Sequence, residues 1–187
     1  TAQANLTAAQ AVAQAAVGSI GVTVDLSEGT ATDGFGAEDT LSNIENVTGT
    51  DEDDTITGNS GPNILSGLGG SDKIYGGSGA DNIVAGSGDD YIVGGLGSDT
   101  IDGGEGVDEV DYSTDESLGG DAGITVDLSS GNAIDGFGSQ EQLSNIENIT
   151  ATDESDVITG SDASNTILGN DGDDIISGLG GADTIEG

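Results

Sequence analysis

The chain has 187 residues, with 36 acidic residues against one basic residue (Lys73), a formal net charge of −35 and no histidine. Nucleic acid and anionic membranes are excluded as natural partners, because they are also negatively charged. With neither cysteine nor histidine, disulfides and ordinary zinc sites are excluded, and only oxygen ligands suited to calcium or magnesium are left.

The acidity and the 35 glycines would suit a disordered chain, unless a basic partner or metal ions neutralise the carboxylates. No apolar run is long enough for a transmembrane helix, so we expect no membrane insertion, and no signal peptide is recognisable. Neither absence excludes secretion of a longer parent protein.

Residues 1–20 are rich in Ala and Gln and carry no charged side chain. Leu6, Ala9, Ala13 and Val17 fall on one helical face, which predicts a short N-terminal helix, although an extended leader fits the same composition.

A long repeat begins at Gly21 and again at Gly123, a spacing of 102 residues, with GVTVDL and LSNIENV of the first copy matching GITVDL and LSNIENI of the second. The first copy covers 21–122 and the second, partial copy covers 123–187. In each, the alternating apolar residues of VTVDL or ITVDL predict a strand, and DGFG predicts a turn. We therefore expect linking strands at 21–48 and 123–150 and a surface loop at 112–122.

From Gly67 to Asp111 the chain repeats every nine residues, as GLGGSDKIY, GGSGADNIV, AGSGDDYIV, GGLGSDTID and GGEGVDEVD. Each nonamer has a glycine-rich first half, an aliphatic residue at position eight and an Asp at position six: Asp72, Asp81, Asp90, Asp99 and Asp108. Less perfect copies extend the array to 49–111, and a second array covers 151–187. Their sixth residues are Asp54, Asn63, Asp156, Asn165, Asp174 and Asp183.

A nonamer with one strand and one tight turn forms half a coil, so 18 residues make a full coil. Like positions then stack about 4.8 Å apart in parallel strands. Glycine is needed where the turn backbone takes positive φ and approaches a ligand closely.

This pattern resembles the G-G-x-G-x-D-x-U-x nonapeptide of RTX (hemolysin-type calcium-binding) proteins. The resemblance implies an all-β, right-handed parallel β-roll (a β-solenoid) that binds several Ca²⁺ ions, each between turns from nonamers two apart. The strongest implied pairs are Asp72 with Asp90, Asp81 with Asp99, and Asp90 with Asp108. Weaker pairs are Asp54 with Asp72, Asn63 with Asp81, Asp156 with Asp174, and Asn165 with Asp183.

Backbone carbonyls at positions two and four are implied to complete the shells. The glycines concerned are Gly70, Gly77, Gly79, Gly86, Gly88, Gly95, Gly97, Gly104, Gly106, Gly172 and Gly181. Glu52 and Glu154 replace the usual fourth glycine, and Pro62 interrupts one copy, which predicts poorer metal binding in those nonamers.

Other interpretations fit less well. A flexible acidic linker needs no aliphatic residue every nine positions, an EF-hand needs a different loop ending in Glu, and a P-loop needs Lys before Ser or Thr. Paired carboxylates can serve a glycosidase, but so many repeated Asp residues favour a structural metal role.

We therefore expect a non-catalytic, calcium-binding region that is unfolded without calcium and folds outside the cell. It would be a structural part of a large secreted or cell-surface protein, such as an S-layer, a matrix fibre or an adhesin. The alternative is a C-terminal accessory domain of a type I-secreted enzyme (protease, lipase or alginate epimerase) or toxin. Self-association and binding of cell-surface polysaccharide are left open.

Overall fold

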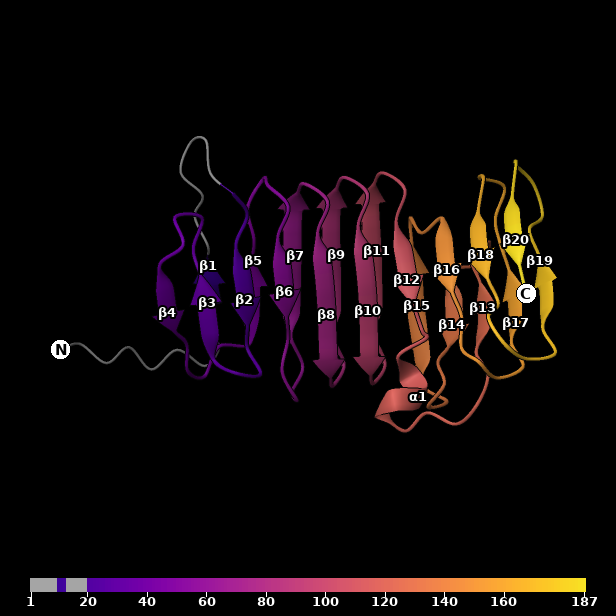
Figure 1. Ribbon diagram of the computed structural model, residues 1–187, viewed down its shortest axis with the longest axis horizontal. Helices are drawn as coiled ribbons and strands as arrows, with labels where there is room; N and C mark the ends of the chain where they lie inside the picture. Colours follow the sequence, from indigo (N-terminus) through magenta and orange to yellow (C-terminus); the bar gives the residue numbers. More distant parts are fainter. Residues whose placement is uncertain (1–9, 13–19) are drawn as a thin grey trace.

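The computed structural model describes residues 10–12 and 20–187, which form an elongated β-roll (Figure 1). The strands stack side by side along the long axis in two sheets of ten strands each. The predicted all-β parallel β-roll is confirmed, although two antiparallel segments interrupt the parallel order.

The first sheet has the order β1-β5-β7-β9-β11-β15-β14-β13-β17-β19, and the second has the order β20-β18-β16-β12-β10-β8-β6-β2-β3-β4. The bounds in chain order are β1 Gln10–Val12, β2 Thr23–Asp25, β3 Thr30–Thr32, β4 Glu38–Thr40, β5 Asn46–Thr48, β6 Thr55–Thr57, β7 Ile64–Gly69, β8 Lys73–Ser78, β9 Asn82–Ser87, β10 Tyr91–Leu96, β11 Thr100–Glu105, β12 Glu109–Asp111, α1 Asp115–Leu118, β13 Thr125–Asp127, β14 Asn132–Ile134, β15 Gln140–Ser144, β16 Asn148–Thr150, β17 Val157–Thr159, β18 Thr166–Leu168, β19 Ile175–Ser177 and β20 Thr184–Glu186.

Strand register in the arrays has a period of 18 residues. Ile92 of β10 pairs with Ile74 of β8 and with Val110 of β12, while Ile101 of β11 pairs with Ile83 of β9. Successive nonamers therefore alternate between the two sheets, and each strand lies beside the strands two nonamers away. This is the half-coil arrangement expected from the sequence.

The core is formed by the aliphatic residues at position eight. In the first array they are fully buried, with exposed fractions of 0% at Ile56, Leu65, Ile74, Ile83, Ile92, Ile101 and Val110. Alternate residues of a strand point to opposite faces, so each strand supplies this residue to the interior. In the last coil Ile185 is 47% exposed, because β20 is an edge strand of its sheet among the described residues.

The linking segments continue the roll by a different topology. β2, β3 and β4 form an antiparallel meander in the second sheet, and β13, β14 and β15 form one in the first sheet. The expected DGFG turns are present, with the N–H of Gly36 donating to the carbonyl of Asp33. The two linking segments thus occupy opposite sheets despite their similar sequences.

Two expectations need revision. The helix predicted over 1–20 falls mostly on residues outside the described ones. Its described part, Gln10–Val12, is the strand β1, which pairs in parallel with the edge of β5. Segment 112–122, expected to be a surface loop, contains α1 and buries Tyr112 and Asp115, which are only 3% and 2% exposed.

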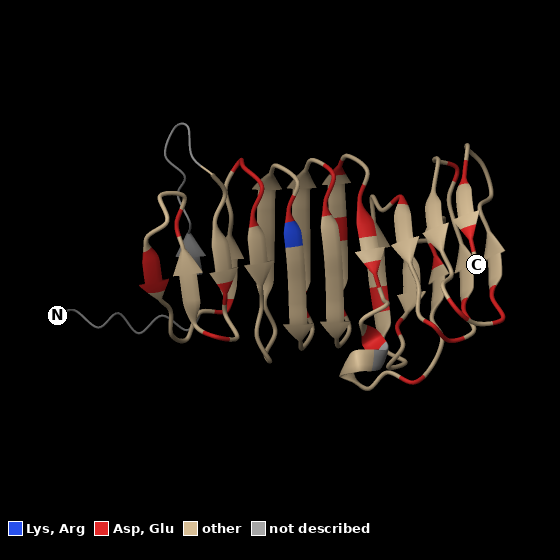
Figure 2. Cartoon of the chain, viewed as in Figure 1, with Lys and Arg blue, Asp and Glu red and all other residues tan. Residues whose placement is uncertain are grey.

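Acidic segments gather at the strand ends and turns, while the single basic residue lies in β8 (Figure 2). Many of these acidic side chains are nevertheless buried, and buried carboxylates require partners. Within the described residues, no helix has the length and apolar character that spanning a membrane requires.

Candidate metal centre

Glycines at positions two and four of the nonamers shape the turns. All eleven glycines predicted to supply carbonyls have positive φ, from 90° at Gly95 to 142° at Gly106. The turns also stack closely, and a Cβ atom placed on Gly97 would overlap the carbonyl oxygen of Gly79 in the neighbouring coil. Both the backbone conformation and the close stacking therefore require glycine here.

The Asp residues at position six form two columns along the roll. One carboxylate oxygen, Oδ1, accepts the backbone N–H of the sixth residue two nonamers earlier. In one column Asp90 accepts from Asp72 at 2.7 Å and Asp108 accepts from Asp90 at 2.9 Å. In the other, Asp99 accepts from Asp81 at 2.8 Å. The structure thus brings together the Asp pairs predicted from the nonapeptide pattern.

The second carboxylate oxygen, Oδ2, is buried and has no hydrogen-bond partner among the described residues in six of these side chains: Asp72, Asp81, Asp90, Asp99, Asp108 and Asp174. A buried carboxylate oxygen without a donor is costly, and a cation would relieve that cost. These orphaned oxygens, together with the surrounding carbonyls, are the hard donors that calcium prefers.

Burial also changes the acidity of these carboxyl groups. The pKa of Asp72 and of Asp81 is raised to about 7, mainly by desolvation, with smaller contributions from Asp54 and Asp90 at Asp72 and from Asp99 at Asp81. Desolvation likewise raises the pKa of Asp99 and of Asp108 to about 6. Without a cation, these four carboxyl groups therefore keep their protons to a higher pH than an exposed Asp does.

The orphaned oxygens of Asp72 and Asp81 each lie near the first residue of their own nonamer and near a carbonyl from the next coil. A Cβ atom on Gly76 would lie 2.8 Å from Oδ2 of Asp81 and would overlap the carbonyl oxygen of Gly94. No three acidic side chains converge as a metal-binding group among the described residues, so the sites must combine one or two carboxylates with backbone oxygens.

This geometry agrees with a comparison against protein families. The model of the RTX calcium-binding nonapeptide repeat matches residues 48–83, 75–110 and 150–185, which together make up more than half of the chain. The chain belongs to the RTX calcium-binding repeat family. A search of curated proteins finds no significant match.

Membership of the RTX family implies calcium binding, and the orphaned oxygens fit that ion. The carbonyl oxygens that complete each coordination shell are predicted to be those of the glycines at positions two and four. When calcium is bound, it supplies positive charge to the columns, while this chain supplies the carboxylates, the turn geometry and the exclusion of water.

The first Asp of each array is satisfied without a cation. Oδ1 of Asp54 accepts the N–H of Val22 and Oδ2 accepts the N–H of Thr50, both at 2.6 Å. In the second array Asp156 accepts from Ile124 at 2.6 Å and from Thr152 at 3.1 Å. The Thr at position two takes the place of a glycine, and we infer that these two Asp residues cap the arrays.

The two Asn residues at position six also have complete partners. Asn63 accepts the N–H of Asn59 and donates from its amide to the carbonyl of Glu45, both at 2.8 Å. Asn165 donates to the carbonyl of Glu147 at 2.7 Å. The side-chain N–H of each Asn thus satisfies a backbone carbonyl without a cation. This arrangement does not favour Asn63 and Asn165 as calcium ligands.

The second array is less enclosed than the first. The N–H of Asp156 donates to Oδ1 of Asp174 and the N–H of Asn165 donates to Oδ1 of Asp183, each at 3.0 Å. Asp174 and Asp183 are half-buried, and only Asp174 has an orphaned Oδ2. The pairs predicted there are brought together, but water reaches them more easily.

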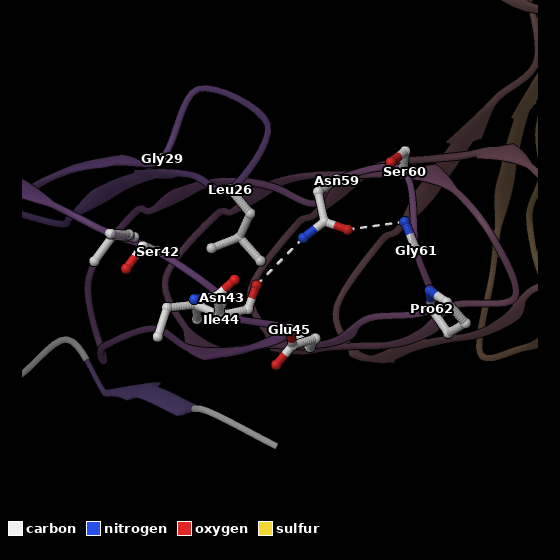
Figure 3. A pocket seen from close by; sticks show the side chains of 11 residues that line it. Leu26, Gly29, Ser42, Asn43, Ile44, Glu45, Asn59, Ser60, Gly61 and Pro62 are labelled. Atoms are coloured by element: carbon white, nitrogen blue, oxygen red, sulfur yellow. Dashed lines mark hydrogen bonds between the residues drawn. The ribbon is translucent and has the colours of Figure 1, made fainter. Parts of the chain in front are cut away.

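A separate cavity of about 400 Å³ lies where the first linking segment meets the roll (Figure 3). Asn59 spans it, donating to the carbonyl of Ile44 and accepting the N–H of Gly61. A smaller cavity of about 160 Å³, with Ser161 in its lining, occupies the matching place in the second repeat. The first cavity is lined by aliphatic residues, small polar residues and the acidic Glu45, and its lining offers no aromatic platform for a sugar.

Sequence reasoning missed several residues of the junction between the long repeats. Glu147 accepts the N–H of Asp108 at 3.0 Å and so takes the place of the next Asp in that column. Thr50 and Thr152 were not recognised as caps, although Thr at position two of the first nonamer in both arrays was a usable signal. The buried pair formed by Glu141 and Tyr112, in which the Tyr112 hydroxyl donates to the carboxylate, was also missed, because neither residue belongs to a nonamer.

Proposed function

We propose that this chain is a calcium-dependent structural module, which is unfolded in a calcium-poor cytosol and folds into a stiff roll outside the cell. Its role is non-catalytic. The observation that supports the proposal is the set of six buried Asp Oδ2 atoms, stacked in columns, that have no hydrogen-bond partner in the described part of the chain. Folding without a cation would bury these groups at a free-energy cost that the small core offsets poorly.

Calcium dependence follows from the energetics of one nonamer. Burying its single aliphatic side chain contributes about 1.5–3 kcal/mol, whereas ordering the backbone costs about 1–2 kcal/mol per residue. Ladder hydrogen bonds add only modest net stability. Metal binding therefore has to contribute to the folding free energy, as it does in other small metal-dependent domains.

We expect the calcium affinity to lie in the range of extracellular modules, with Kd about 10⁻⁴–10⁻³ M. Such an affinity leaves the chain unfolded during export and folded in external calcium. Secretion by a type I pathway and display at the cell surface are the settings that suit this behaviour.

Continuity of the sheets supports a spacing role. β11 pairs in parallel with β15, and β12 pairs in parallel with β16, so both sheets pass through the junction between the long repeats. We propose that repeats joined in this way build an extended part of an S-layer, a matrix fibre or an adhesin. An accessory domain of a secreted enzyme or toxin is the alternative, and a catalytic domain on the same polypeptide would favour it.

Circular dichroism of the chain in chelator and during titration with calcium tests the proposal. We expect little β signal in chelator and a cooperative gain at millimolar calcium. Magnesium at the same concentration is the matched control and should induce much less structure, because it dehydrates reluctantly and demands a tighter octahedral site. A full β signal in chelator would contradict the proposal.

A further inference from the structure

An acidic side chain occupies a core position in the second linking segment. In β15 the residues alternate between exposed and buried, and Glu141 and Leu143 face the interior. Glu141 is only 1% exposed, and its strand pairs with β11 on one side and with β14 on the other. An ionisable group so deeply buried requires a partner.

One oxygen of Glu141 has a partner and the other does not. The buried hydroxyl of Tyr112 donates to Oε2 at 2.6 Å, while Oε1 accepts no hydrogen bond from the described residues. Oδ2 of Asp99 is orphaned in the same way. A Cβ atom on Gly94 would lie 2.8 Å from Oδ2 of Asp99 and 3.1 Å from Oε1 of Glu141, so the two orphaned oxygens border one small space.

In other coils this space is bordered by a backbone carbonyl from the nonamer two positions on. Beside Gly67 the carbonyl oxygen of Ala85 lies 2.5 Å from the same Cβ point, and beside Gly160 that of Gly178 lies at 2.8 Å. For Gly94 the corresponding residue is Tyr112, where the nonamers have ended. Glu141 thus presents a carboxylate oxygen where the regular stack would present a carbonyl.

The surroundings of Glu141 are strongly acidic. Its pKa is raised to about 8, mainly by burial, with smaller contributions from Asp99, Asp135 and Asp115. Asp135 and Asp115 are themselves buried, and Oδ2 of Asp135 is also orphaned. Acidic segments gather where β12, β15 and α1 meet (Figure 2). The described residues near Glu141 thus supply negative charge and a tyrosine hydroxyl.

We propose that Asp99 and Glu141 together bind a calcium ion that joins the end of the first nonapeptide array to the linking sheet of the second long repeat. The inference rests on the proposed calcium binding, but assigns a ligand from outside the nonapeptides. Tyr112 is a positioning residue, because its hydroxyl holds Oε2 and leaves Oε1 facing Asp99.

The first long repeat offers a matched control. Asp39 of β4 lies 102 residues before Glu141, and it pairs with Ala31 as Glu141 pairs with Ala133. In this chain β4 is the edge strand of its sheet, and Asp39 is exposed. Asp39→Asn therefore removes an equivalent carboxylate from a place without a neighbouring nonapeptide Asp.

The experiment compares the wild-type chain, Glu141→Gln and Asp39→Asn by titration calorimetry and equilibrium dialysis with calcium, alongside urea denaturation at saturating calcium. We expect Glu141→Gln to lose one bound calcium, or to weaken that site by at least about 100-fold. Its stability at saturating calcium should fall, because the binding free energy of that ion is lost. Asp39→Asn should match wild type in both measurements.

The outcomes separate the two proposals. If neither wild type nor Asp39→Asn binds calcium, the proposed function fails. If wild type binds calcium and Glu141→Gln binds the same number of ions with the same affinity, only the junction site is overturned. A loss of stability at saturating calcium with the full number of ions still bound would show a purely structural role and would also overturn it.

A second variant keeps the inference testable if Glu141→Gln does not fold. Tyr112→Phe keeps the carboxylate but releases its Oε2 atom. We expect about a tenfold weaker affinity at one site, the scale seen when an outer-shell partner of a metal ligand is removed. An unchanged calcium titration of Tyr112→Phe would count against the arrangement.

Discussion

The backbone N–H of Asp72 donates a 2.7 Å hydrogen bond to Oδ1 of Asp90, while Oδ2 of Asp90 has no partner among the described residues. One half of each carboxylate thus joins neighbouring coils directly, and the other half is free for a cation. Folding and metal binding therefore use the same side chain, which explains why one short motif can serve both.

Asp90→Asn should separate these two uses. The amide keeps an acceptor for the N–H of Asp72 but removes the charge that faces the cation. We expect the calcium midpoint of folding, as measured by circular dichroism, to rise by about tenfold or more. An unchanged midpoint would mean that Oδ2 of Asp90 does not bind calcium.

Asp54→Asn is the contrasting control. Both oxygens of Asp54 accept backbone N–H groups. In Asp54→Asn, the side-chain NH₂ would therefore face one of these backbone N–H donors, which would lose its acceptor. We expect a loss of about 1–3 kcal/mol in the free energy of unfolding, the usual cost of a buried unsatisfied group, as measured by urea denaturation at saturating calcium.

Stability of the calcium-free roll should depend on pH. The pKa of Asp72 and Asp81 is raised from 3.8 to about 7 in the fold, so the folded form binds more protons than the unfolded chain. This stabilisation is complete below about pH 4 and is lost as the pH rises through about 7. Circular dichroism in chelator should therefore show more β structure at pH 4–5 than at pH 8, and the reverse order would contradict the described burial.

Core packing at position eight should be sensitive to truncation. Ile92 is 0% exposed and lies between Ile74 and Val110 in register. Ile92→Ala should cost about 2–5 kcal/mol in calcium, since it leaves a cavity in a stacked column. Val84→Ala, on a side chain that is 40% exposed, is the control and should change stability by less than about 0.5 kcal/mol. Urea denaturation at saturating calcium measures both, and equal effects would refute the inward-facing column.

Gly97→Ala tests the stacking of the turns. Its φ is +140°, and an added Cβ would overlap the carbonyl oxygen of Gly79. We expect the variant to lose calcium-induced folding of the first array. Gly36→Ala is the control, because Gly36 has φ of +81° but nothing within 4 Å of the Cβ position. It should cost only about 1–2 kcal/mol of backbone strain. A normal calcium titration of Gly97→Ala would show that the turns have room to separate.

The periodic parts of the fold follow from the sequence alone. Ile74, Ile92 and Val110 recur every 18 residues, and a periodic chain finds its contacts in its own copies. The columns of Asp residues and the positive φ at the glycines follow from the same period, because stacking identical turns leaves few other arrangements. Local pattern and tertiary contact agree in these segments.

The junctions were decided by the tertiary structure. Glu141 lies next to Asp99 only because β15 joins β11 in parallel and β14 in antiparallel fashion, and no period in the sequence specifies that pairing. The satisfied side chains of Asn63 and Asp54 likewise depend on backbone groups of the linking segments. The nine-residue period of the sequence determines which strands and turns stack on one another. The fold of the non-periodic linking segments determines which buried oxygens are left without a hydrogen-bond donor and are open to a cation.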